Sequence, residues 1–180
     1  VIAAGNDSAD LQHDGGVISL PSEGAQALSV SATGPIGFQW GESGLESPPQ
    51  SPAFYTNYGT NAVTIGAPGG DADLEAAETD APYFYDLVFN TTAAVEFEYE
   101  DIDDDGEEEP VDYLGAEPTY GWKAGTSMAA PHVAGAAALV KSANPNYNAN
   151  QVESALKGAA EVPDGYGKEY YGAGYLDILD

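Results

Sequence analysis

The sequence predicts an α/β fold in which a parallel sheet is flanked by helices, and two observations support this class. The opening segment VIAAGN is a short apolar strand that ends in Gly5 and Asn6, and open α/β sheets hold ligands at such strand ends. Residues 128–140 are nearly all small or aliphatic, which indicates a helix that is apolar around most of its circumference and buried in the core.

Ser127 lies at the N-terminus of the main predicted helix, which we expect to run from about Thr126 to Ala143. Unpaired backbone N–H groups and the helix dipole favour negative charge at such a position, which suits an oxyanion that develops beside the serine. Pro131 is expected in the first turn, where its missing N–H costs nothing, and it places the helix start a few residues upstream. Gly125 permits close backbone approach before the serine.

The stretch from Gly125 to Val140, GTSMAAPHVAGAAALV, resembles the nucleophile motif of the subtilisin-like serine proteases. The match holds at every fixed position from Gly125 to Gly135. The G-x-S-x-G elbow of the α/β-hydrolases is not met, because Ala129 stands where its second glycine would be. The resemblance implies a serine endopeptidase with the three-layer, parallel-sheet subtilisin-like fold, in which Ser127 is the acylating nucleophile.

Other segments resemble the same family in the same order along the chain. In that family the asparagine of the Ala-Ala-Gly-Asn segment donates to the tetrahedral oxyanion, which implies this role for Asn6 and a place in the substrate-pocket wall for Ala4 and Gly5. Asn148, with Gln151 three residues later, predicts a capped second helix. The segments FYTNYGTNAVTIGAPGG and YYGAGYLDI resemble the family's strand with its Ala-Pro-Gly turn and its closing segment.

The general base that a serine nucleophile needs is not evident among the two histidines. His132 follows Ser127 by five residues on one helix, about 500° of rotation and about 7.5 Å of rise, so the two side chains point apart. We therefore interpret His132 as a packed structural residue. His13 lies in the loop segment DLQHDGG and lacks the His-Gly-x-His setting of the family's base.

In the resembling family the triad aspartate and histidine precede the oxyanion asparagine. We therefore expect residues 1–180 to be the C-terminal part of one catalytic domain whose N-terminal part is missing. Residues 1–180 are expected to be inactive alone. The expected partners are the upstream part of the domain and a peptide or protein substrate. Two alternatives stay open: a noncatalytic relative with a degenerate triad, and a calcium-dependent interaction module.

Two insertions are expected relative to shorter family members, at about 71–84 and 93–118, with a strand at 85–91 between them. Within the second, VEFEYE alternates apolar and acidic residues, which predicts a half-exposed strand. The following DIDDDGEEEPVD resembles a calcium-binding EF-hand loop. The resemblance assigns Ca²⁺ ligands to Asp101, Asp103, Asp105, Glu107, Glu109 and Asp112. A solvated acidic surface is the competing interpretation.

The composition is strongly acidic, with 4 Lys and Arg against 30 Asp and Glu and a formal net charge of −26, yet 43% of the residues are hydrophobic. This combination indicates a folded domain whose surface repulsion is screened in molar salt, as in an extreme halophile. The acidic surface argues against nucleic-acid and anionic-membrane partners. Cysteine is absent, and the resembling enzymes are mostly secreted, so an extracellular location is expected.

Overall fold

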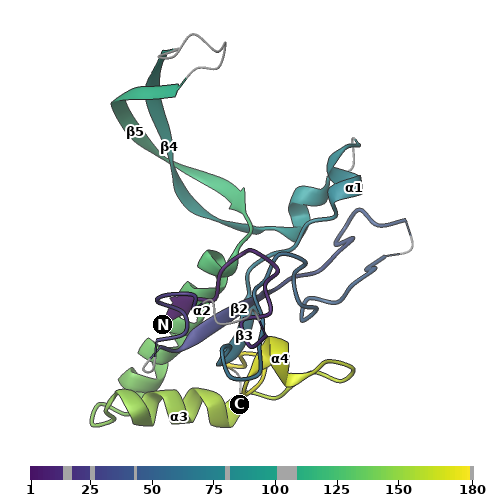
Figure 1. The fold of residues 1–180 in the computed structure, drawn as a ribbon. Helices are drawn as coiled ribbons and strands as arrows, with labels where there is room; N and C mark the ends of the chain where they lie inside the picture. Colours follow the sequence, from purple (N-terminus) through teal and green to yellow (C-terminus); the bar gives the residue numbers. More distant parts are fainter. Residues whose placement is uncertain (14–17, 25–26, 43, 80–81, 101–108, 179–180) are drawn as a thin grey trace. The chain divides into compact units, whose positions relative to one another are not determined.

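The computed structural model describes residues 1–180 except 14–17, 25–26, 43, 80–81, 101–108 and 179–180, and the chain has an α/β fold. It divides into two compact units: one combines Val1–Val88 with Lys123–Asp180, and the other is Phe89–Trp122. The elements, labelled in Figure 1, are β1 (Ile2–Ala3), β2 (Ser29–Thr33), β3 (Ile65–Pro68), α1 (Leu74–Ala77), the 3₁₀-helix η1 (Tyr83–Asp86), β4 (Val88–Glu100), β5 (Glu109–Lys123), α2 (Thr126–Ala143), α3 (Ala149–Ala159) and α4 (Lys168–Tyr171).

The larger unit is built on a parallel sheet in the order β1-β2-β3, which confirms the predicted class. Ile2 pairs with Ser29, and Val30 pairs with Ile65. All five residues of β2 are buried, as expected of the central strand of a parallel sheet. β1 is an edge strand, because no described strand pairs with its other side.

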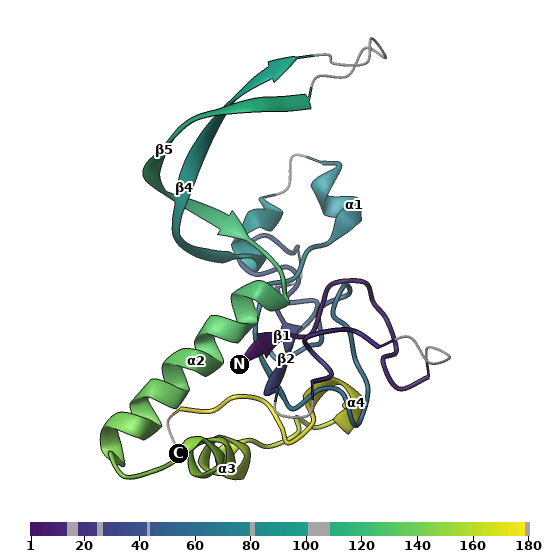
Figure 2. The ribbon, with the colours of Figure 1, turned by 60° about the vertical axis from the view of Figure 1, so that its left-hand side comes forward.

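Helix α2 begins and ends where the sequence predicts, and it packs against all three strands (Figure 2). Its buried residues are Thr126, Ala129, Val133 and Ala136, whose spacing of three and four marks one face of a helix. The prediction of burial around most of the circumference is wrong for this chain. Leu139 is 60% exposed, because no described segment covers the face of α2 opposite the sheet.

The predicted position of Pro131 in the first turn is also wrong, since it is the sixth residue of α2. Proline has no N–H, so the Ser127 carbonyl, four residues earlier, receives no helix hydrogen bond from it. His132, the next residue, instead forms a hydrogen bond from its ring Nδ1 to the Met128 carbonyl at 2.9 Å. The turn that carries the serine therefore lacks one hydrogen bond of the helix.

The capped second helix is confirmed as α3. The Asn148 side chain accepts from the Gln151 N–H at 3.0 Å, and the Gln151 side chain accepts from the Asn148 N–H at 2.9 Å. This reciprocal pair is a capping box, which fixes the helix start. α3 packs against α2. Among the described residues, no helix has the length and apolarity that a membrane span requires.

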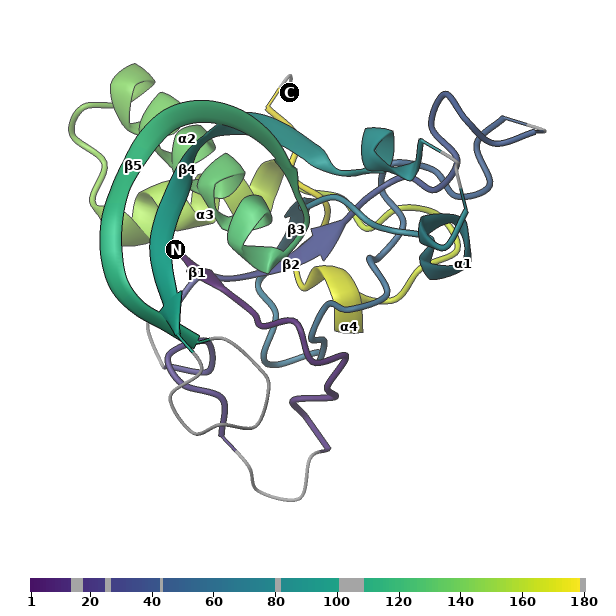
Figure 3. The ribbon, with the colours of Figure 1, turned by 90° about the horizontal axis from the view of Figure 1, so that it is seen from above.

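The smaller unit is a hairpin of β4 and β5, seen as a curled ribbon in Figure 3. The predicted strand at 85–91 begins only at Val88, because Tyr83–Asp86 form η1. Residues 95–100, VEFEYE, lie in β4 as predicted, but they are exposed on both faces of the strand. The reason is that the described part of this unit has one layer of two strands and nothing packed on it.

Candidate active site

The site lies where β1, β3 and the start of α2 meet. β1 leads directly into Ala4, Gly5 and Asn6, and the N–H of Gly125 donates to the carbonyl of Gly69, just after β3, at 3.0 Å. A Cβ on Gly69 would lie 2.8 Å from the Gly125 carbonyl oxygen and 3.3 Å from the Ala129 Cβ, both at the start of α2. The glycine therefore allows α2 to begin close to the carboxyl edge of the sheet, where α/β folds place their ligands.

A closed hydrogen-bond network joins Asn6 to Thr126. The side-chain oxygen of Asn6 accepts from the Thr126 N–H at 2.9 Å and from its hydroxyl at 2.8 Å. The same hydroxyl oxygen accepts from the Gly5 N–H at 3.1 Å. Because Asn6 uses its oxygen as a double acceptor, its Nδ2 group is the part of the amide that remains to donate.

Two donors border one small space beside Gly125. A Cβ built on this glycine would lie 3.4 Å from Asn6 Nδ2 and 3.7 Å from the Ser127 backbone nitrogen. Among the described residues, neither nitrogen donates a hydrogen bond to the protein. Gly125 has φ of 152°, a conformation that L-residues rarely adopt. The glycine thus keeps open a space that two N–H donors flank, the arrangement that stabilises an oxyanion.

The sequence-predicted residues Asn6 and Ser127 come together here, and both are exposed. Ala4 is fully buried and Gly5 is half-buried. The expected role of Ala4 and Gly5 in a substrate pocket stays a prediction. Thr126, which sequence analysis did not assign to the site, is fully buried beneath them.

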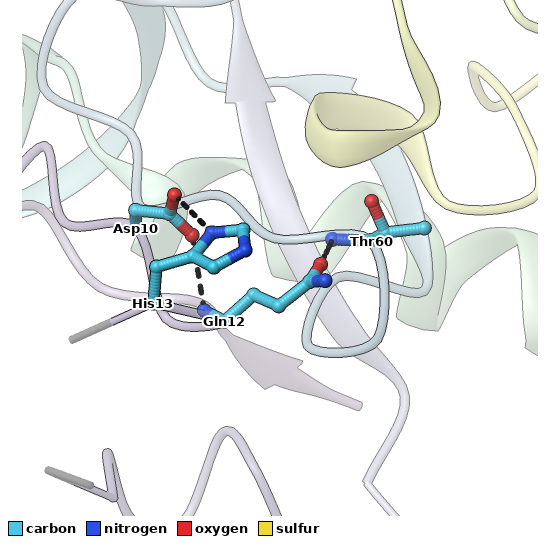
Figure 4. A network of polar contacts seen from close by, with 4 residues as sticks. All are labelled: Asp10, Gln12, His13 and Thr60. Carbon is cyan, nitrogen blue, oxygen red and sulfur yellow. Dashed lines mark hydrogen bonds and ion pairs between the residues drawn. The ribbon is translucent and has the colours of Figure 1, made fainter. Parts of the chain in front are cut away.

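Neither histidine of the chain forms a hydrogen bond with Ser127 among the described contacts. His132 bonds to its own helix, as given above. His13 Nδ1 lies 2.7 Å from Asp10 Oδ2, and its side chain is 72% exposed. Figure 4 shows this pair with Gln12, whose side-chain oxygen accepts from the Thr60 N–H at 3.1 Å. The hydrogen bond from His13 lowers the pKa of the Asp10 carboxyl, so the pair forms a local surface network.

Asn57 is a site residue that sequence analysis missed. It is only 1% exposed, and its side-chain oxygen accepts from the N–H groups of Asp7 at 2.9 Å and Ala9 at 3.0 Å. Its amide donates to the Ala4 carbonyl at 3.1 Å, and its backbone N–H donates to the Gly5 carbonyl at 3.0 Å. A single buried side chain therefore fixes the backbone on both sides of Asn6.

Asp71 is a second missed residue, a buried carboxyl just after β3. Its Oδ1 accepts from the N–H groups of Ala72 at 2.8 Å and Phe54 at 3.3 Å. Burial is the main cause that raises its pKa to about 6, and these two hydrogen bonds oppose the rise. Tyr55, which donates from its hydroxyl to the Gly70 carbonyl at 2.5 Å, has its pKa raised by burial and by Asp71.

Four of the six expected calcium ligands, Asp101, Asp103, Asp105 and Glu107, lie outside the described residues. The other two, Glu109 and Asp112, lie in β5, and Asp112 Oδ1 accepts from the Tyr113 N–H at 2.9 Å. The described part of the chain has no group of three or more metal-binding side chains. The calcium site therefore stays a prediction.

Comparison with known proteins points to one family. Residues 1–174 match the model of the subtilase family, peptidase S8. The minor extracellular protease Vpr of Bacillus subtilis is 41% identical over 66 residues, which are 34% of this chain and 8% of that protein. Subtilisin DY of Bacillus licheniformis is 46% identical over 61 residues, 33% of this chain and 21% of that protein.

Solved structures extend the likeness over the whole chain. A protease from Pseudoalteromonas arctica aligns with 99% of this chain and 40% of its own, at 29% identity and a TM-score of 0.63. A lanthipeptide protease aligns with 96% of this chain and 48% of its own, at 26% identity and a TM-score of 0.62. The chain thus spans less than half the length of the solved structures it matches.

Proposed function

The chain belongs to the subtilase family of serine proteases, and from this premise we propose that it is the nucleophile-bearing part of a serine endopeptidase domain. The observation that carries the proposal is the space beside Gly125, which the amide of Asn6 and the N–H of Ser127 both border. The Vpr protein of Bacillus subtilis and the lanthipeptide protease are both proteases by name. A peptide or protein is accordingly the proposed substrate.

In the proposed reaction the Ser127 hydroxyl attacks the scissile carbonyl carbon, and its proton passes to a histidine base. The carbonyl oxygen becomes an oxyanion that accepts from Asn6 Nδ2 and the Ser127 N–H. Collapse of this intermediate breaks the peptide bond, and the base returns the proton to the leaving amine. Water then attacks the acyl-serine by the reverse route and releases the second product.

We place the base and its aspartate in chain outside these 180 residues. Two features support this assignment, namely the exposed face of α2 that includes Leu139 and the unpaired side of β1. Apolar helix faces and strand edges of this kind are normally covered in a complete α/β fold. Residues 1–180 alone would then retain the oxyanion donors and the nucleophile but would not turn over substrate.

The proposed setting is extracellular and saline. A relative is an extracellular protease by name. The net charge of −26 supports a saline medium, because ionic strength near 1 M shortens the Debye length to about 3 Å and suppresses repulsion between surface carboxylates.

The proposal is tested by peptide hydrolysis with the protein expressed from its full open reading frame. Ser127→Ala should reduce turnover to the uncatalysed background while the circular dichroism spectrum stays unchanged. Ser142→Ala, an exposed serine on the same helix, is the matched control and should retain full activity. Undiminished turnover in Ser127→Ala would refute the nucleophile, and inactivity of the unmodified protein would favour a noncatalytic relative.

A further inference from the structure

The hairpin unit, Phe89–Trp122, has a face of aromatic side chains that nothing described covers. Aromatic rings are in contact between its two strands. The ring centroid of Phe89 lies 4.6 Å from that of Trp122 and 5.7 Å from that of Tyr120, and the centroid of Phe97 lies 5.9 Å from that of Tyr113. The two rings of each pair lie on the same face of the ribbon, because they are in contact across it. These rings stay accessible, with Phe89 53% and Tyr113 58% exposed.

The face of β4 opposite Phe97 is acidic. Along β4 the apolar residues Val95, Phe97 and Tyr99 alternate with Glu96, Glu98 and Glu100, and successive side chains of a strand point to opposite faces. Between Phe89 and Trp122 the sequence holds twelve Asp and Glu residues and no Lys, Arg or His. β4 is therefore amphipathic over residues 95–100, with one aromatic face and one anionic face.

The two outer edges of the ribbon differ in their capacity to pair. β5 contains Pro110 and Pro118, and proline cannot donate to a further strand. β4 contains no proline over its 13 residues, and no described strand other than β5 pairs with it, so its outer edge can accept an added strand. A two-stranded ribbon is marginal in water, and an added strand would extend it to three.

We propose that the outer edge of β4 binds an extended polypeptide whose apolar and basic residues alternate. Such a strand has the same two-residue period as β4, so its apolar side chains would lie on the aromatic face and its Lys or Arg side chains beside Glu96, Glu98 and Glu100. The charge of the unit disfavours a second copy of this chain, because twelve carboxylates would meet twelve more.

The bound polypeptide is a substrate segment if the proposed function holds. Trp122, the last residue of the hairpin unit, precedes Ser127 by five residues in the sequence. A segment held on the hairpin is tethered to the protein that carries the nucleophile, which raises its effective concentration for cleavage. The substrate class inferred is an extended cationic polypeptide, and this step alone rests on the proposed function.

The test measures binding separately from cleavage, using the Ser127→Ala protein from the full open reading frame at 0.1 M salt. Three labelled 16-residue peptides are titrated. The first alternates Leu and Lys, and the second alternates Leu and Glu. The third has the Leu and Lys content of the first, arranged as two Leu followed by two Lys. We expect the alternating Leu-Lys probe to bind at least tenfold more tightly than the other two. Equal affinity for all three would overturn the proposal.

Variants then locate the binding surface. Phe97→Ser and the double change Glu96→Lys with Glu98→Lys should each weaken the Leu-Lys probe at least tenfold, whereas Thr119→Ser on β5 should not. The charge-reversed double variant should gain affinity for the Leu-Glu probe, a gain that an unfolded hairpin would not give. Unchanged affinities in all variants would show that the probe binds at another surface and would contradict the inference.

A short chromogenic tetrapeptide that lacks the alternating apolar and basic pattern separates the two proposals. Its cleavage by the unmodified protein, together with no probe preference, would refute the hairpin inference and leave the protease proposal standing. Tight Leu-Lys binding without cleavage of either substrate would refute the protease proposal and leave the hairpin as a polypeptide-binding ribbon.

Discussion

The side-chain oxygen of Asn6 accepts two hydrogen bonds from Thr126, a residue 120 positions later in the chain. This pair joins the end of β1 to the first residue of α2, and it fixes which end of the Asn6 amide faces the space beside Gly125. A donor aimed in advance at a developing charge stabilises a transition state without reorganisation. The position of the amide is thus set by a residue that is fully buried.

Replacement of Asn6 should lower turnover far more than substrate affinity. Asn6→Asp keeps an oxygen for Thr126 but removes the Nδ2 donor. We expect kcat to fall about 100- to 1000-fold, a range established for such a donor on a member of this family, with KM changed little. Steady-state kinetics on a peptide substrate measure kcat and KM for the Asn6→Asp protein. A loss of kcat in Asn57→Gln alone would not test the donor role of Asn6. If the kcat of the Asn6→Asp protein stays within threefold of the kcat of the unmodified protein, Asn6 is excluded as the donor.

Thr126→Val should uncouple Asn6 from α2. The change keeps the side-chain shape but removes the hydroxyl that donates to Asn6 and accepts from Gly5. Leaving buried partners without a hydrogen bond costs about 1 to 3 kcal/mol, and the freed amide should also lower kcat. Thr126→Ser, which keeps the hydroxyl, is the control. Urea unfolding and kinetics together check the prediction, which fails if the Val and Ser variants behave alike.

Asn57→Asp should disturb the turn that presents Asn6. The carboxylate still accepts from Asp7 and Ala9, but it cannot donate to the Ala4 carbonyl, and it introduces a charge at a position only 1% exposed. We expect a loss of stability of about 2 to 4 kcal/mol near neutral pH. Chemical denaturation at pH 5 and pH 8 measures it, and the loss should be larger at pH 8. A pH-independent loss would contradict the buried-charge explanation.

Asp71 should make folding stability decrease as the pH rises from about 4 to about 6. Its pKa is raised from 3.8 to about 6 in the folded chain, so the folded state binds more protons than the unfolded state in this range. The stabilisation present below the unfolded pKa is therefore lost as the pH passes the folded pKa. The loss should be about 1 to 2 kcal/mol after allowance for residual solvation.

The measurement compares the unmodified chain with Asp71→Asn in urea unfolding across pH 4 to 7. The difference between the two isolates this carboxyl from the other 29 acidic residues. The variant should gain stability relative to the unmodified chain as the pH rises. Parallel pH profiles would show that Asp71 titrates normally.

Salt should stabilise the chain strongly. With a net charge of −26, raising KCl from 0.1 M to 1 M should raise the thermal midpoint by about 10 °C or more, because the Debye length falls from about 10 Å to about 3 Å. The rise should level off above 1 M, where screening is nearly complete. A midpoint that does not change with KCl would contradict the proposed saline setting.

The local signals in the sequence predicted the elements that pack on the core. The apolar run after Ser127 fixed α2 at Thr126–Ala143, and Asn148 with Gln151 fixed the start of α3. What the sequence did not predict is long-range. The contacts of Asn57 span about 50 residues. Asp71 was missed because its burial depends on segments far away in sequence.

The hairpin shows a further limit. Alternation in VEFEYE correctly predicts a strand, but period-two patterns do not specify whether either face is covered. The same holds for α2, where an apolar circumference suggested full burial although Leu139 lies exposed. Both errors have one physical cause: a residue pattern reports what a surface favours as a neighbour, and the part of the chain that the structure describes does not supply that neighbour.

The most direct measurement is labelling of the protein from its full open reading frame with a fluorophosphonate, followed by mass spectrometry to locate the modified residue. The account predicts a single adduct on Ser127, lost in Ser127→Ala, and none when residues 1–180 are treated alone, because the base is then absent. An adduct on another residue, or none on Ser127 in the full protein, would contradict the assignment of Ser127 as the nucleophile.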